Sequence, residues 1–114
     1  MERFIEIIDY YILNYDSFKK GKISFDCCYG ELIFYKKKDN ILILYAIYIF
    51  PKYRKNGLCQ SILHYLIDKA EEHKFKYFLI QDVISKILYE YLLRFSYKDK
   101  MFKNTKHGFI YKIK

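Results

Sequence analysis

The sequence predicts a single α+β domain over residues 1–114, an α/β sandwich with helices on both faces of a mixed, mostly antiparallel sheet. Three observations lead to this fold class. The chain is 114 residues long, which suits one hydrophobic core. Hydrophobic residues make up 53%, which excludes a disordered chain despite 30% charged residues. The middle of the chain reads as strand, loop, helix, strand, and a helix of that length joins parallel strands by a right-handed crossover.

The first third of the chain predicts one helix and one hairpin. Apolar side chains recur at helical spacing over residues 3–16, although Phe4–Ile8 alone is also compatible with a short strand. The segments Ile23–Cys28 and Glu31–Lys36 then read as two strands. They are joined near Tyr29-Gly30, so we expect them to pair antiparallel.

The middle third predicts the centre of the sheet. Ile41–Phe50 is almost wholly apolar, as expected of a strand covered on both faces. A polar loop over 51–56 follows, and Gly57 opens the next helix, whose polar residues lie away from one apolar stripe. Phe75–Gln81 is the strand that this helix leads to. The stripe consists of Leu58, Ile62, Leu66 and Ala70.

The last third predicts a helix and two strands. The helix runs from about Val83 to Leu93, and the strands lie near Phe95–Phe102 and Phe109–Ile113 around a turn at 104–108. The side chains that the helix should bury are Ile84, Ile87, Leu88, Tyr91 and Leu92.

The charge and the cysteine content exclude some classes of protein but do not identify a function. The net charge of +8 suits polyanions, but lysine-rich composition also follows from AT-rich codons. Three cysteines without a C-x-x-C spacing, namely Cys27, Cys28 and Cys59, argue against a disulfide framework or a metal site. No signal peptide is visible, and the longest apolar run is about half a membrane span. We therefore expect a soluble cytoplasmic protein with no membrane partner.

The loop between the buried strand and the next helix has the features of a phosphate site. The first turn of a helix carries backbone N–H groups without intrahelical partners, and the helix dipole adds positive charge there. Gly57 lets the backbone approach an anion closely, and Lys52, Arg54 and Lys55 add positive charge. Taken alone, the same residues also fit a plain strand-to-helix turn with a solvated basic rim.

Three segments of the chain resemble one family. Arg54-Lys55-Asn56-Gly57-Leu58-Cys59 is similar to the R/Q-x-x-G-x-G/A signature of the GNAT superfamily of N-acetyltransferases. The preceding Ile49-Phe50-Pro51-Lys52-Tyr53-Arg54 resembles the end of that family's fourth strand. Downstream, Leu88–Phe95 resembles the family's L-Y-E-K-L-G-F segment with one extra residue. The resemblance covers roughly residues 40–103.

This resemblance implies acetyl-CoA as cosubstrate, bound where a central pair of parallel strands splays apart. It implies that the backbone of Ile47 and Ile49 pairs with the pantetheine arm. It also implies that Asp82, at the family's Asn position, lies near the cofactor, and that Tyr89 is the general acid for the CoA thiolate. A phenol suits this role because its reference pKa near 10 lies above that of a thiol. The amides implied to hold the pyrophosphate belong to Arg54, Lys55, Asn56, Gly57, Leu58 and Cys59.

The chain departs from the family pattern in four places. Cys59 replaces a small Gly or Ala, Asp82 replaces Asn, and Arg94 stands where L-G-F has Gly. Only about 20 residues precede the first predicted hairpin, where the family uses a strand and two helices to form the acceptor site. The acceptor pocket is then open, borrowed from a second subunit, or absent. No acidic residue stands on the strand 41–50, so we expect water to remove the proton of the amine, with Glu31 and Asp82 as alternative bases.

The leading functional hypothesis is an acetyl-CoA-dependent N-acetyltransferase that acts on a primary amine of a small molecule or a protein. The alternative is a degenerate member that binds CoA or a protein partner without catalysis. A basic nucleic-acid-binding module, with Tyr35–Lys38 as its best local candidate, is the less favoured third reading. A homodimer is compatible with the short N-terminal region.

Overall fold

The computed structural model describes residues 2–37, 40–54, 57–81, 83, 86–106 and 108–113. Of the residues singled out above, Lys55, Asn56, Asp82 and Ile84 lie outside the described residues. The helices are α1 (Glu2–Leu13), α2 (Leu58–Glu72) and α3 (Lys86–Arg94), with 3₁₀ turns at Tyr15–Ser17 and Pro51–Tyr53. The strands are β1 (Gly21–Cys27), β2 (Gly30–Lys36), β3 (Ile41–Ile49), β4 (Tyr77–Gln81), β5 (Ser96–Tyr97), β6 (Lys100–Met101), β7 (Lys103–Thr105) and β8 (Gly108–Lys112).

Six strands form the main sheet in the order β1-β2-β3-β4-β8-β7. Among the described strands of this sheet, only β3 and β4 are parallel neighbours, and the other pairs are antiparallel. The mixed, mostly antiparallel sheet is therefore confirmed. The register of β3 with β4 runs from Ile41 opposite Tyr77 to Leu44 opposite Ile80, after which β3 continues to Ile49. Within the described residues, the second half of β3 has no strand partner on the β4 side.

A bulge marks the place where the parallel pair parts. Ile33 of β2 pairs with Ala46 of β3, and Phe34 pairs with Leu44, so Tyr45 is an extra residue in β3. A bulge of this kind bends its strand and increases the local twist. β3 therefore turns away from β4 at the residue where their pairing ends.

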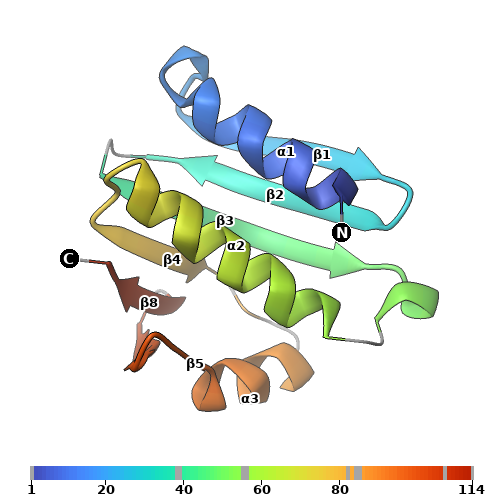
Figure 1. The fold of residues 1–114 in the computed structure, drawn as a ribbon, viewed down its shortest axis with the longest axis vertical. Helices are drawn as coiled ribbons and strands as arrows, with labels where there is room; N and C mark the ends of the chain where they lie inside the picture. Colours follow the sequence, from blue (N-terminus) through green and yellow to red (C-terminus); the bar gives the residue numbers. More distant parts are fainter. Residues whose placement is uncertain are drawn as a thin grey trace.

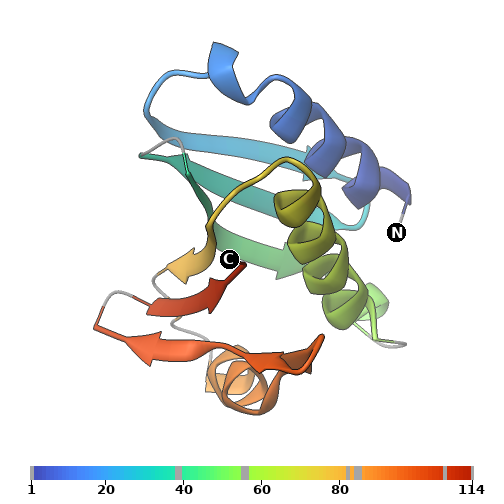
Figure 2. The same ribbon diagram turned by 60° about the vertical axis from the view of Figure 1, so that its left-hand side comes forward.

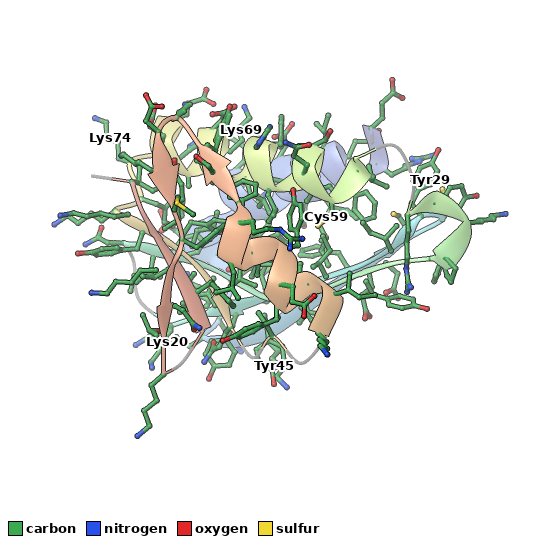
Figure 3. The ribbon with its side chains drawn as sticks, turned by 90° about the horizontal axis from the view of Figure 1, so that it is seen from below. Lys20, Tyr29, Tyr45, Cys59, Lys69 and Lys74 are labelled. Carbon is green, nitrogen blue, oxygen red and sulfur yellow. The ribbon has the colours of Figure 1, made fainter. Side chains whose placement is uncertain are left out.

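The helices α1 and α2 lie side by side over one face of the sheet, while α3 lies at its edge beneath the end of β4 (Figures 1 and 2). Tyr45 points away from α1 and α2, on the opposite side of the sheet (Figure 3). Of the helices expected on both faces, the structure places two on one face and one at the edge. A right-handed crossover fixes the face that α2 covers, and α1 packs beside α2 on that face.

The core lies between the sheet and the helix pair. The helix predicted over residues 3–16 is α1, which ends at Leu13 and is followed by the 3₁₀ turn, and no short strand forms there. Tyr11 of α1 stacks on Phe34 of β2 with ring centroids 4.1 Å apart. Lys36 is buried at the far end of β2, where its Nζ donates hydrogen bonds to the carbonyl oxygens of Tyr15 (2.6 Å) and Phe18 (2.9 Å). These bonds satisfy a buried ammonium group and fasten the chain after α1 to the sheet.

The C-terminal third differs from the sequence prediction. The expected strand at Phe95–Phe102 is instead a small hairpin of β5 and β6, separate from the main sheet. Its turn residues Lys98 and Asp99 have φ values of 53° and 61°. Two consecutive positive φ angles reverse the chain within two residues, as in the tight turns that suit twisted hairpins.

The burial expected of α3 is also corrected. Ile87 is 82% exposed, and Leu92 is the buried residue among those described in α3. Leu88 and Tyr91 are half-buried against the core. Because α3 packs at the edge of the sheet, only part of its apolar surface reaches the core.

Candidate acetyl-CoA groove

A groove with a volume of about 530 Å³ lies where β3 and β4 part. One wall comes from the second half of β3 and the first turn of α2, and the other comes from α3. Cys59 lies between α2 and α3 in the view from below (Figure 3). The lining residues are Ile47, Tyr48, Ile49, Arg54, Gly57, Leu58, Cys59, Gln60, Ile87, Leu88 and Tyr91.

The β3 wall presents the edge of a strand. Ile47 and Ile49, whose backbone the family resemblance implied to pair with the pantetheine arm, line the groove. Pairing with β4 ends at Leu44, so no described strand occupies that side of β3 beyond it. An extended ligand with amide groups can therefore pair with the β3 backbone as an added strand would.

Arg54 closes the far end of this strand edge. Its Nε donates a 2.6 Å hydrogen bond to the carbonyl oxygen of Ile49. Its guanidinium carbon lies 5.2 Å from the ring centroid of Tyr48, a cation–π arrangement. A guanidinium has five N–H donors, so this bond leaves others for an anion at the mouth of the groove.

The first turn of α2 has the geometry of an anion site. Gly57 adopts the left-handed conformation with φ 68° and ψ 25°, and Ser61 N–H donates to its carbonyl oxygen at 3.0 Å. The amides between these two residues precede the first helical hydrogen bond and have no intrahelical acceptor. The first turn of α2 contains no acidic residue, so nothing in it offsets the positive end of the helix dipole.

Cys59 stands in this turn without adding charge to it. Burial raises the pKa of the Cys59 thiol from 9.0 to about 11. Burial also raises the pKa of the nearby Tyr91 hydroxyl, and repulsion from a charged Cys59 would raise it further. Both groups are therefore neutral near pH 7, and the thiol departs from the family's Gly or Ala in size but not in charge.

Tyr89 lies beside the groove rather than in its lining. Its ring packs edge-on against Phe109 of β8 with centroids 5.1 Å apart, and its hydroxyl oxygen accepts a 2.6 Å hydrogen bond from Nδ2 of Asn104. Tyr91, two residues further along α3, lines the groove. The two tyrosines of this helix therefore have different surroundings.

The structure thus brings together in one groove all six of the predicted cofactor residues that it describes, namely Ile47, Ile49, Arg54, Gly57, Leu58 and Cys59. The sequence reading missed the groove residues Tyr48, Gln60, Ile87, Leu88 and Tyr91. The α3 residues among them were assigned to a core stripe, because helical spacing alone does not distinguish a side chain that faces the core from one that faces a groove.

Within the described ranges, no three His, Cys, Asp or Glu side chains gather closely enough to hold a metal ion. In the same residues, no helix is long and apolar enough to cross a membrane.

Solved acetyltransferase structures share this fold. A GNAT-family acetyltransferase from Staphylococcus aureus Mu50 superposes with a TM-score of 0.55 at 15% identity, covering 75% of this chain and 61% of that one. A putative acyl-CoA N-acyltransferase from Klebsiella pneumoniae gives a TM-score of 0.52 at 13% identity, covering 96% of this chain and 85% of that one. A GNAT-family acetyltransferase from Elizabethkingia anophelis with acetyl-CoA bound gives 0.50 at 16% identity, covering 94% and 78%.

These identities are low enough that the superpositions establish the fold alone. The chain spans about three fifths of the length of the S. aureus protein. No curated protein matches the sequence. The model of the acetyltransferase (GNAT) family matches residues 18–95, which is more than half of the sequence. The chain therefore belongs to the GNAT family of acetyltransferases.

Proposed function

We propose that this protein is an acetyl-CoA-dependent N-acetyltransferase that transfers an acetyl group to a primary amine. One observation carries the proposal: a single groove joins the open edge of β3 to the acid-free N-terminus of α2. The two ends of this groove match the two parts of CoA, an amide-bearing arm and a pyrophosphate. The E. anophelis structure, which has the same fold, holds acetyl-CoA.

The groove residues fit the cofactor in chemical type. The backbone of Ile47 and Ile49 pairs with the pantetheine amides, while the apolar side chains of α3 cover the arm from the other side. The amides from Gly57 to Cys59 hold the pyrophosphate, and Arg54 supplies positive charge. Lys55, Asn56 and Asp82 complete this proposed set from outside the described residues.

Tyr89 is the proposed general acid, and sheet register supports its location. Its ring rests on Phe109, which pairs with Ile80, and Ile80 pairs with Leu44. Leu44 is the last β3 residue that pairs with β4. Tyr89 is therefore level with the point where the strands part, which is where the thioester end of a strand-paired cofactor would lie.

The reaction follows from these positions. The amine nitrogen attacks the thioester carbonyl carbon, the new C–N bond forms, and the C–S bond breaks. The CoA sulfur takes the proton of the Tyr89 hydroxyl, and the amine loses its proton to water. Holding amine and thioester in line supplies much of the rate enhancement. The proposed acceptor is the primary amine of a small molecule or a protein. That the protein is cytoplasmic and forms a homodimer stays a prediction.

Calorimetric titration with acetyl-CoA tests the cofactor assignment. We expect saturable binding, and no heat of binding at millimolar acetyl-CoA would overturn the proposal. Transfer is then measured as thiol release with spermidine, free lysine and a lysine-containing peptide as acceptors. Acetyl-CoA hydrolysis without any amine is the control.

A second function, cofactor binding without transfer, is favoured by the absence of Tyr89 from the groove lining. Saturable acetyl-CoA binding with no thiol release from any of the three amines supports this alternative. Amine-dependent thiol release excludes it.

A further inference from the structure

The proposed acid Tyr89 is held at two points by one cross-strand pair. Asn104 of β7 and Phe109 of β8 are direct register partners. Residues opposite one another in an antiparallel pair point to the same face of the sheet. Phe109 contacts the Tyr89 ring edge-on at 5.1 Å, and Asn104 Nδ2 donates to the Tyr89 oxygen at 2.6 Å. The β7–β8 pair therefore holds both the ring of Tyr89 and its hydroxyl group.

The direction of the hydrogen bond from Asn104 matters for proton transfer. A phenol has one O–H donor and two acceptor lone pairs. Because the Asn104 amide donates, it occupies a lone pair and does not use the phenol proton. That proton can point to a different acceptor, and Tyr89 lies level with the end of the β3–β4 pairing.

We propose that Asn104 is a positioning residue that turns the Tyr89 proton toward the departing CoA sulfur. This inference rests on the proposed function and adds a residue to it. As the C–S bond breaks, the proton moves from the Tyr89 oxygen to the sulfur. The oxygen is left negative, and the Asn104 N–H then makes a charge-assisted hydrogen bond to it, which is stronger than the bond to a neutral phenol. Tyr89 regains its proton from water.

The experiment compares Asn104→Ala with Asn104→Asp. Alanine removes the donor, whereas aspartate keeps the shape but accepts the phenol proton instead of donating. We expect either change to lower kcat roughly tenfold to a hundredfold, with KM for acetyl-CoA within about twofold. The matched control is Asn14→Ala, because the Asn14 side chain also donates one hydrogen bond, to the Tyr10 carbonyl oxygen on α1. We expect this control to leave kcat unchanged.

A double-mutant cycle separates positioning from a general structural role. In a Tyr89→Phe background the loss from Asn104→Ala should disappear, because there is no hydroxyl left to orient. An undiminished further loss in that background would overturn the proposal. Full activity of Asn104→Asp would also overturn it, because the phenol would then donate to residue 104.

A measurement without turnover distinguishes failure of this inference from failure of the proposed function. In ¹³C-tyrosine NMR the Tyr89 ring signal is assigned by its loss in Tyr89→Phe. We expect that signal to move in Asn104→Ala while the Tyr91 signal stays. An unmoved Tyr89 signal would mean that Asn104 does not hold the Tyr89 hydroxyl group, and it would overturn the inference. If the Tyr89 signal moves in Asn104→Ala but the unaltered protein transfers no acetyl group, the contact exists and the proposed function is overturned. The role of Asn104 in catalysis is then overturned with it.

Discussion

The two walls of the groove are built very differently. The β3 and α2 wall is carried by two elements of the core: away from the groove, Leu42 and Leu44 of β3 are fully buried, and α2 buries five residues, namely Ile62, Leu63, Leu66, Ile67 and Ala70. The α3 wall is nine residues long and, among its described residues, buries Leu92 alone. Ile87 is 82% exposed and Leu93 is 47% exposed. The first wall therefore maintains the fold, and the second adds groove surface and the proposed acid.

The largest expected effect is on the core wall. Leu44→Ala should lower the free energy of unfolding by about 2–5 kcal/mol, because it leaves a cavity where β3 meets β4. Urea denaturation measures the loss. The matched control is Leu93→Ala on α3, for which we expect a change within about 0.5 kcal/mol. Equal losses from the two leucines would remove the distinction between the walls.

The next largest effect is on catalysis by the α3 wall. Tyr89→Phe deletes one hydroxyl, so kcat should fall on the order of 100-fold while KM for acetyl-CoA stays unchanged. Tyr91→Phe is the comparison on the same helix. Because Tyr91 lines the groove, this variant should raise KM and leave kcat within a few-fold. The opposite pattern in steady-state kinetics would transfer the acid role to Tyr91.

A pH dependence follows from the burial of Cys59. The folded state keeps the thiol proton until its pKa of about 11, whereas an ordinary thiol loses it near 9.0. Between these values the folded state binds more protons than the unfolded state, so stability contributed by the neutral thiol is present below pH 9.0 and lost toward pH 11. The stability difference between the unaltered protein and Cys59→Ala should shift by about 2 kcal/mol over this window. Urea denaturation at several pH values measures it, and a constant difference would mean that Cys59 is not desolvated.

A smaller effect is expected at the anion site. Gly57 has φ 68°, and a side chain there costs about 1–2 kcal/mol of backbone strain. Gly57→Ala should weaken acetyl-CoA binding about tenfold in calorimetry, because relief of that strain moves the first amides of α2. Gly21→Ala is the control: it has φ 123° and open space around its Cβ position, far from the groove in sequence and fold. Equal weakening by both would argue against a site at Gly57.

The smallest effect is expected at the exposed end of α3. Ile87→Ala should leave the free energy of unfolding within about 0.5 kcal/mol, because Ile87 contributes little to the core. It should weaken acetyl-CoA binding roughly threefold, since the side chain covers part of the bound cofactor. Calorimetry alongside urea denaturation checks both numbers. Unchanged affinity would mean that the cofactor does not reach this part of α3.

The sequence predicted the core wall better than the α3 wall. The strand predicted at Ile41–Phe50 is observed at Ile41–Ile49, and the helix predicted to open at Gly57 begins at Leu58. Their apolar patterns are long and have one explanation each, since a strand inside a sheet and a helix over it are both buried. The α3 pattern was ambiguous because its apolar residues divide between core and groove.

The C-terminal strands were also predicted less well from the sequence. The sequence pattern predicted one strand near Phe95–Phe102, yet the chain reverses between these two buried residues at Lys98 and Asp99. Aspartate tolerates a positive φ, but lysine is not typical of such turns and neither residue is a glycine or an asparagine, so the composition of the turn was a weak signal.

By itself, the sequence determined the order of the main elements and the antiparallel and parallel parts of the sheet, and it predicted an anion site at the start of α2. These depend on neighbours within a few residues: apolar spacing, Gly57, and the absence of acid in the first helical turn. The tertiary structure decided which α3 side chains face the groove and which residue holds the Tyr89 hydroxyl. Asn104 lies 15 positions from Tyr89, and Lys36 lies 21 positions from the carbonyl oxygen of Tyr15 that it binds. Contacts of this kind form only when separate elements pack together, so no local pattern encodes them.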